Sequence, residues 1–353
     1  MVPTNRPIRN LTFAIDLARD LDCPILVLCS GQARALATEA MFRTIRGAAV
    51  TVSSTPRHPL FALRTRRLLR FSAAPYLDTS NKRNVALLLG RMLNWERVLF
   101  LDDDIRGLAA AEVTAAAAAV SATGTRVVGW RPVDFPDNSV VCHALRTVTR
   151  PWDALLGRRQ DVFIGAGALL VDLTEQMPFF PPVYNEDWLF WHDFVVRRQV
   201  GCLGSVRQLE FNPFLDPQRA TGEEFGDVLA EGLYELVHQG RSVLVGCLPE
   251  HWREVIRHRQ EMLDGIERRL WKRRQRRTRT QDGYEIASVL RSVAAAREAL
   301  NRLSPEVLAE FVAAWRYDQF HWNARLHLLP KVGELAEALA WLGITDVHLA
   351  SEV

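Results

Sequence analysis

The chain has 353 residues, of which 48% are hydrophobic and 24% are charged. This balance is ordinary for a folded globular protein and excludes global disorder. The formal net charge is only +3, so the total alone predicts no polyanionic partner. The length accommodates one large α/β domain and a smaller helical region.

Cysteine usage and the absence of long apolar runs indicate the compartment. The five cysteines are scattered and form no Cys-x-x-Cys pair, so we expect neither a disulfide framework nor a zinc site. The sequence contains no apolar run as long as a membrane span, and its start, MVPTNRPIRN, lacks the apolar core of a signal peptide. These features predict a cytoplasmic protein with reduced thiols.

Apolar runs of strand length alternate with helical patterns in the first half of the chain. In order, the pattern predicts a helix over 11–21, a strand over 24–29, a helix over 85–93 and strands over 97–101, 126–130 and 161–171. This alternation predicts an α/β fold with a mainly parallel sheet and helices on both faces. Ligands bind such sheets beyond the carboxyl ends of the strands.

From about residue 250 the sequence predicts helices only. We therefore expect one domain over residues 1–245 and an all-helical region over 246–353. The stretch 251–279 carries 11 basic and four acidic residues, a net charge of 11 − 4 = +7. Because acids are interleaved and no nucleic-acid motif is present, a solvated helix face or a contact with a phospholipid surface is favoured over nucleic-acid binding.

Three consecutive aspartates, Asp102, Asp103 and Asp104, directly follow the predicted strand 97–101. Crowded carboxylates repel one another unless a cation or hydrogen-bond donors compensate them. Mg²⁺ and Mn²⁺ commonly bind through one or two carboxylates together with substrate phosphates. The triplet alone is compatible with such a metal site and with a solvated acidic turn.

Two further polar segments favour the metal site. Residues 81–84 (Asn-Lys-Arg-Asn) precede the helix predicted from residue 85, and cations at a helix start are unfavourable unless an anion binds there. Lys82 and Arg83 therefore predict a diphosphate site. Further along the chain, Glu186 and Asp187 lie beside Trp188, and an apolar surrounding would raise a carboxyl pKa toward that of a general base.

The string SNKRNVALLLGRMLNWERVLFLDDDI (80–105) resembles the region that leads into the DxD motif of GT-A glycosyltransferases, particularly family 2. VPTNRP (2–7) resembles the end of their first strand. FIGAGALLVDL (163–173) and NEDWLFW (185–191) resemble the acceptor-side segment that ends in their ED motif. The resemblance covers about residues 2–240. It implies a GT-A, Rossmann-like fold and the metal-dependent transfer of a sugar, with inversion, from a nucleoside-diphosphate sugar to an acceptor hydroxyl of unknown identity.

The resemblance also implies roles for individual residues. Asp104 would ligate Mn²⁺ or Mg²⁺, and Asp102 would contact the metal or the ribose. Asp187 would be the catalytic base, with Glu186 shaping the acceptor pocket; if the backbone is extended, these adjacent acids cannot both point into one pocket. The other implied donor contacts are Lys82, Arg83, Asn84, Asp103, Gly165, Gly167 and Arg219.

Departures from the family pattern leave alternatives open. The later QxxRW motif is absent, although Gln218 and Arg219 lie in the corresponding region, so a retaining GT-A transferase stays open. A sugar-nucleotide pyrophosphorylase would share the scaffold, but VPTNRPIRN lacks the glycine-rich loop of those enzymes. A nucleic-acid-binding protein and a non-catalytic GT-A-like binding protein are the alternatives outside enzymes.

Overall fold

The computed structural model describes residues 1–42, 45–53, 58–71, 74–133, 135, 139–149 and 164–349, and its strands form two sheets. The first has the order β1-β2-β3-β9, built from β1 (Val2–Thr4), β2 (Ile25–Cys29), β3 (Gly47–Thr51) and β9 (Val347–Leu349). The second has the order β4-β7-β6-β8-β5, built from β4 (Arg97–Leu101), β7 (Ala168–Asp172), β6 (Val127–Pro132), β8 (Val200–Gln208) and β5 (Ile105–Arg106).

The backbone of Met1 links the two sheets side by side. Its amino group donates to Leu99 O at 2.9 Å, and Leu101 N donates to Met1 O at 3.0 Å. This linkage places the carboxyl end of β1 beside that of β4. The aspartates that follow β4 therefore lie next to the residues that follow β1.

The predicted α/β class is confirmed, and the predicted mainly parallel sheet is correct only in part. β1 with β2, β2 with β3 and β6 with β8 are parallel pairs. β7 runs antiparallel to both β4 and β6. Burial on both faces makes a strand continuously apolar whichever way it runs, so the sequence pattern could not show this direction. Of the strand predicted over 161–171, residues 161–163 lie outside the described part.

Helices cover both faces of the sheets, as expected. One apolar core lies under α1 (Thr12–Asp20) and α4 (Ala110–Thr123) and takes alternate residues of β2, such as Val27. The other core takes Leu26 and Leu28 of the same strand and lies against α3 (Ala74–Met92) and α7 (Glu186–Val196). The shorter elements are α2 (Ala35–Glu39), α5 (Val140–Val148), η1 (Ile8–Leu11), η2 (Pro59–Phe61), η3 (Thr65–Phe71) and η4 (Val243–Cys247).

The start predicted for the helix over 85–93 is wrong. Helix α3 already begins at Ala74, so Lys82 and Arg83 lie in its interior. Both side chains are buried and bonded to other parts of the protein, which allows a polar run inside the helix. Residues 81–84 therefore do not lie at a helix N-terminus, and no anion is needed there to compensate Lys82 and Arg83.

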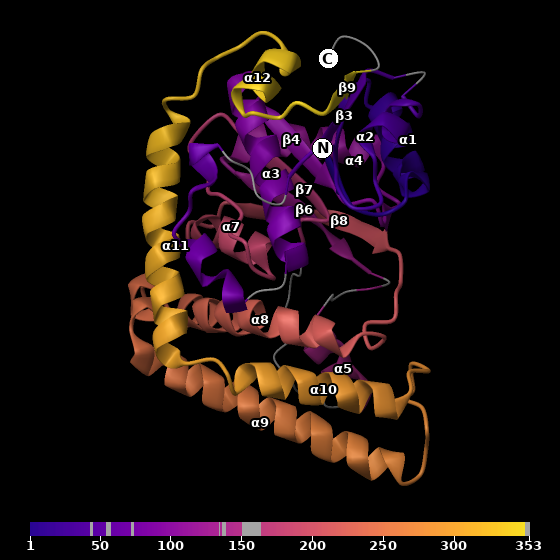
Figure 1. Cartoon of the computed structure of the whole chain (residues 1–353), viewed down its shortest axis with the longest axis vertical. Helices are drawn as coiled ribbons and strands as arrows, with labels where there is room; N and C mark the ends of the chain where they lie inside the picture. Colours follow the sequence, from indigo (N-terminus) through magenta and orange to yellow (C-terminus); the bar gives the residue numbers. More distant parts are fainter. Residues whose placement is uncertain are drawn as a thin grey trace.

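A helical layer follows the sheets in the chain. It contains α8 (Pro217–His238), α9 (Pro249–Arg274) and α10 (Ile286–Leu300), which lie together below the sheet in Figure 1. Helix α11 (Pro305–Leu326) then runs along one side of the molecule toward α12 (Leu335–Trp341) (Figure 1). Over the described residues, no helix has the length and apolar character needed to cross a membrane.

The prediction that residues 246–353 are all-helical is wrong, because this region also contains a strand. After α12 the chain adds β9 to the first sheet, antiparallel to β3. The carboxylate of Asp318 in α11 also accepts hydrogen bonds from the backbone N–H groups of Arg64 and Thr65, each at 2.8 Å. The region after residue 245 is therefore attached to the N-terminal half at several points.

The basic stretch 251–279 is only in part a solvated face. Arg259 of α9 is fully buried, and its guanidinium binds the carboxylates of Glu224, Asp227 and Glu231 in α8. Arg273 donates to the carbonyl oxygens of Thr147 and Val148 at the end of α5. The exposed basic residues gather toward the end of α9 and just beyond it, over 268–279.

Candidate active site

The acidic turn after β4 is held by two arginines. Asp102 N donates to Gly167 O at 2.8 Å, and the Asp102 carboxylate accepts from Arg83 Nη2 at 3.0 Å. Arg6, two residues beyond β1, contacts both following acids: its Nη1 lies 2.7 Å from Asp103 Oδ1 and 2.9 Å from Asp104 Oδ2. Each crowded carboxylate thus has a nearby cation, as like charges at this distance require.

Asp104 keeps one carboxylate oxygen without a partner. Its Oδ2 accepts from Gln208 Nε2 at 3.3 Å and contacts Arg6. Its Oδ1 is buried and has no hydrogen-bond partner. A buried unpaired carboxylate oxygen is costly. Asp104 is one of the residues that line the pocket.

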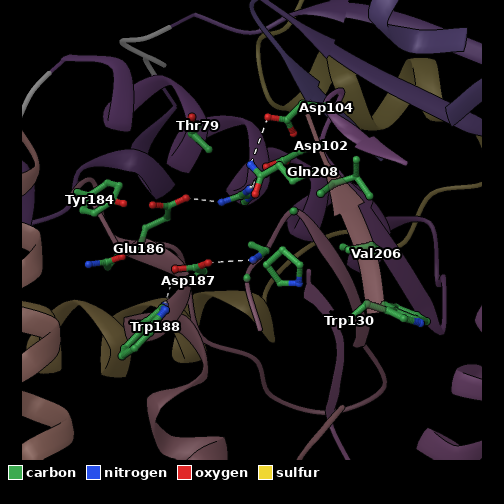
Figure 2. A pocket seen from close by; sticks show the side chains of 18 of the residues that line it. Thr79, Asp102, Asp104, Trp130, Tyr184, Glu186, Asp187, Trp188, Val206 and Gln208 are labelled. Carbon is green, nitrogen blue, oxygen red and sulfur yellow. Dashed lines mark hydrogen bonds and ion pairs between the residues drawn. The ribbon is translucent and has the colours of Figure 1, made fainter. Parts of the chain in front are cut away.

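Arg83 connects the acidic turn with the start of α7. Its guanidinium is buried, with Nη2 on Asp102 and Nη1 on Glu186 Oε1 (Figure 2). Burial raises the pKa of Glu186 to about 8, although Arg83 acts in the opposite direction. Burial likewise raises the pKa of Asp102 to about 6.

Asp187 faces the same pocket from the first turn of α7. Its Oδ2 accepts from Ala166 N at 2.8 Å, and its Oδ1 accepts from Trp188 N at 2.9 Å (Figure 2). Burial raises the pKa of Asp187 above its ordinary value, against the lowering effect of Arg83 and of these backbone N–H groups. Such a carboxyl group is a candidate general base.

Glu186 and Asp187 line the same pocket. The backbone there forms a helical turn and is not extended, so the condition under which adjacent acids could not share a pocket is not met. Asn185, just before them, has φ +60°, in the left-handed region that asparagine tolerates better than most residues. This conformation directs the chain into the helix at Glu186.

One pocket of about 240 Å³ brings the two acidic groups together (Figure 2). Its floor includes Gly165 and Gly167, and a Cβ atom at Gly167 would lie 3.3 Å from Ile105 Cδ1 and 3.5 Å from Asp102 Oδ2. An adjacent pocket of about 140 Å³ extends past Thr4, Lys82 and Asp103. The two pockets share Arg6, Thr79, Asp102 and Asp104.

Two residues expected to contact the donor are engaged with the protein itself. The Lys82 ammonium donates to Thr4 O at 2.7 Å, Ser30 Oγ at 2.7 Å and Asp78 Oδ2 at 2.6 Å, which accounts for its three hydrogens. Burial lowers its pKa, against the opposing effect of Asp78.

Asn84 is a packing residue in this structure. Its amide donates to Phe180 O and accepts from Phe180 N, both at 2.8 Å, and it lines neither of the two pockets. The predicted donor contact of Asn84 therefore conflicts with its position. The side chain instead fixes α3 against the segment before α7.

The remaining predicted residues lie at the pockets. Arg219, near the start of α8, lines the larger pocket, binds Glu223 Oε1 through Nε at 2.6 Å and lies over the ring of Phe211. Asp103 is buried and also accepts from Thr4 Oγ1 at 2.5 Å. It lines the smaller pocket.

Sequence reasoning missed several lining residues. Arg6 stands within the quoted VPTNRP segment, and its place after a strand was the signal that could have identified it. The others come from segments without a recognisable motif, so no sequence signal pointed to them. Among them are Thr79, Trp130, Tyr184, Gln208 and Phe211.

Comparisons with known proteins give only distant similarity. No family model matches the sequence, and no curated protein matches it. Among solved structures, the chain is similar to two structures of glucosyl-3-phosphoglycerate synthase from Mycobacterium tuberculosis, one in complex with Mn²⁺, UDP and glucosyl-3-phosphoglycerate and one with phosphoglyceric acid. Each shows 17% identity and a TM-score of 0.39, over 68% of this chain and 79% of that chain. This similarity is too low to support a fold or a function, so inferences about this chain rest on its own residues.

Proposed function

We propose that this chain is a metal-dependent glycosyltransferase of the GT-A type, similar to family 2. In this proposal it transfers a sugar from a nucleoside-diphosphate sugar to an acceptor hydroxyl, with inversion at the anomeric carbon. The observation that carries the proposal is that Asp102 and Asp104 line the same pocket as Glu186 and Asp187, across the shared partner Arg83. In this reaction, Asp102 and Asp104 would hold the metal on the diphosphate side, and the acids of the other pair would serve the acceptor side.

The acids after β4 fit a divalent cation that is shared with a substrate. Among the described residues, no cluster of three or more His, Cys, Asp or Glu side chains forms a complete metal site. Mg²⁺ and Mn²⁺ do not need one, since they bind through one or two carboxylates with phosphates and water as further ligands. In this proposal, Asp104 and Asp102, which both line the pocket, would each supply one carboxylate oxygen. When bound, the cation would neutralise charge that develops on the nucleoside diphosphate.

Arg6 and Arg83 are the cations best placed for the diphosphate. The side chain of Arg6 is 45% exposed and lines both pockets, so it can turn toward a bound anion. Arg83 is fixed between Asp102 and Glu186 and lines the larger pocket. A contact from Lys82 would have to replace one of its three hydrogen bonds. We therefore expect Lys82 to hold the residues around the site in place through these hydrogen bonds, without contacting the donor.

Asp187 is the proposed base. The acceptor oxygen forms a bond to the anomeric carbon while the bond from that carbon to the diphosphate oxygen breaks, and the acceptor proton passes to the Asp187 carboxylate. Glu186 suits this role less, because its pKa of about 8 keeps it protonated near neutral pH and Arg83 occupies its Oε1. Glu186 would instead shape the acceptor side of the pocket.

A thermal-shift panel tests the proposal. Wild-type protein is heated with UDP-, GDP- and dTDP-glucose and with the corresponding nucleoside diphosphates, each with and without Mn²⁺. We expect at least one nucleotide to raise the melting temperature in the presence of Mn²⁺ and to have little effect without it. A ligand that binds the folded protein and not the unfolded chain stabilises the folded protein. If no nucleotide stabilises the protein under either condition, the proposed function is wrong.

A further inference from the structure

Helix α8 contacts the segment that carries Glu186 and Asp187 at three points. A Cβ atom at Gly226 would lie 2.1 Å from Tyr184 O, so the backbones of the helix and the segment are in direct contact there. Asp227 Oδ1 accepts from Asn185 Nδ2 at 2.9 Å. Further along the helix, the Tyr234 hydroxyl donates to Trp188 O at 3.0 Å.

The middle contact holds a residue with an unusual backbone. Asn185 has φ +60°, and its side chain does not cap α7 but reaches across to Asp227. A non-glycine residue in the left-handed region is held there by its surroundings. Asp227 therefore fixes the conformation of the residue from which the chain enters Glu186 and Asp187.

A buried arginine compensates the charge of Asp227. Arg259 Nη2 lies 2.8 Å from Asp227 Oδ2, and Ser139 Oγ donates to the same oxygen at 2.6 Å. Arg259 also binds Glu224 at 2.8 Å and Glu231 at 2.5 Å. A buried carboxylate is tolerated only when it is paired and hydrogen-bonded, so Arg259 of α9 stabilises Asp227 in its place.

We propose that α8 positions the acceptor-side acids, with Gly226 and Asp227 as positioning residues and Arg259 as the buried counter-ion of Asp227. Gly226 sets how closely the helix approaches Tyr184, and Asp227 fixes the turn at Asn185. The result is the placement of Asp187, whose Oδ2 lies 2.8 Å from Ala166 N. The inference rests on the proposed function, because it gives Asp187 a part in the reaction.

Gly226→Ala tests the close approach without any change of charge. In an exposed helix interior this substitution would be favourable, but here the new methyl group must displace Tyr184. The matched control is Gly265→Ala in α9, where a Cβ atom would meet nothing within 4 Å. The rate is the release of nucleoside diphosphate, with Mn²⁺, from the tightest-binding member of the UDP-, GDP- and dTDP-glucose panel.

We expect Gly226→Ala to lower kcat by about 10²-fold, a loss that a displacement of about 1 Å at a reacting group can cause. The KM for the donor should change little, because Arg6, Arg83 and Asp104 lie on other elements. Gly265→Ala should match the wild type. Equal kcat for Gly226→Ala and wild type, or a parallel change in kcat and KM, would overturn the inference.

Replacements of Asp227 test the hydrogen bond and apply even if Gly226→Ala does not fold. Asp227→Asn keeps an oxygen that can accept from Asn185, whereas Asp227→Ala removes it. We therefore expect kcat to fall less in Asp227→Asn than in Asp227→Ala, measured on protein that circular dichroism shows to be folded. Equal losses in both variants would contradict a positioning role.

A crystal structure of Gly226→Ala or Asp227→Ala separates this inference from the proposed function. We expect Asp187 Oδ2 to lie beyond hydrogen-bond distance from Ala166 N in the variant. If the wild type binds no nucleotide but the variant shows this displacement, the proposed function fails and the positioning of the turn stands. If Asp187 stays in place in the variant, the positioning fails, whatever reaction the wild type performs.

Discussion

Burial acts to lower the pKa of the Arg83 guanidinium, but the carboxyl groups of Asp102, Glu186 and Asp187 outweigh it and the pKa is raised. Glu186 is buried, whereas Asp102 and Asp187 are half-buried, so the charged form is least favourable at Glu186. Glu186 has its pKa raised to about 8 and is the group that stays protonated near neutral pH. This distribution leaves Asp187 as the acid best able to accept a proton.

The two adjacent acids therefore give different expected results when each is replaced by its amide. Asp187→Asn removes the base and should lower transfer by about 10²–10⁴-fold, the usual contribution of a positioned acid–base group. Glu186→Gln resembles the protonated side chain that is already present, so its loss should be much smaller. Turnover and donor affinity of the two variants are measured in parallel. A larger loss of turnover in Glu186→Gln than in Asp187→Asn would show that Glu186, and not Asp187, is the base.

The protonation of Glu186 also affects stability. Its pKa rises from 4.5 to about 8 on folding, so the folded protein binds this proton more tightly than the unfolded chain does. Its contribution to stability is complete below about pH 4.5 and is lost as the pH rises through about 8. Glu186→Gln has no such proton to lose.

We therefore expect the stability difference between Glu186→Gln and wild type to move in favour of the variant from pH 5 to pH 8. The slope for one proton is at most about 1.4 kcal/mol per pH unit. Urea unfolding of both proteins across this range measures it. Parallel stability profiles would show that Glu186 titrates normally.

At the scale of elements, the sequence predicted what depends on local pattern and missed what depends on contacts. The strand predicted over 97–101 matches β4, because a continuous apolar run is a local signal. The start of α3 was missed, because burial of Lys82 and Arg83 depends on partners far away in the chain.

The basic residues of α9 also differ in contacts that their local sequence pattern does not show. Its basic residues look alike in the sequence, but Arg259 belongs to the core and Arg253 and Arg257 pair with glutamates. Residues 268–279 contain no acid, and their basic side chains other than Arg273 are exposed. Trp271 is 50% exposed beside Arg274, whose guanidinium carbon lies 5.0 Å from the ring centroid.

We expect this end of α9 to bind anionic phospholipid surfaces, where each nearby basic residue contributes about 1 kcal/mol. The protein should sediment with phosphatidylglycerol vesicles at low salt and much less with phosphatidylcholine vesicles. Combined replacement of Arg274, Arg276 and Arg277 by Gln should abolish the binding. The matched control, Arg253 and Arg257 replaced by Gln on the same helix, should retain it. Equal loss in the two variants, or equal binding to both lipids, would contradict this expectation.

At the scale of the whole molecule, the α/β class and the convergence of motifs at one site could be predicted from the sequence. The return of the C-terminal segment to the first sheet could not. β9 pairs with β3 across nearly 300 residues of sequence, Val50 opposite Val347, and its three residues carry no distinctive pattern. The place of Arg6 after a strand indicates a pocket residue, but its pairing with Asp103 and Asp104 could not be predicted, since it requires β1 to lie beside β4. Motif order predicted which segments meet, but the pairs of side chains within the site follow from tertiary packing.

The measurement that tests the central claim most directly is calorimetric titration of a nucleoside-diphosphate sugar, with and without Mn²⁺, into wild type and Asp104→Asn. Asn keeps the size of the side chain but removes the charge and one of the two carboxylate oxygens of Asp104. We expect wild type to bind the donor tightly only with Mn²⁺ and Asp104→Asn to bind at least about 10-fold more weakly, a loss of about 1.4 kcal/mol. Unchanged, metal-dependent affinity in Asp104→Asn would contradict the placement of the metal and donor at the end of β4.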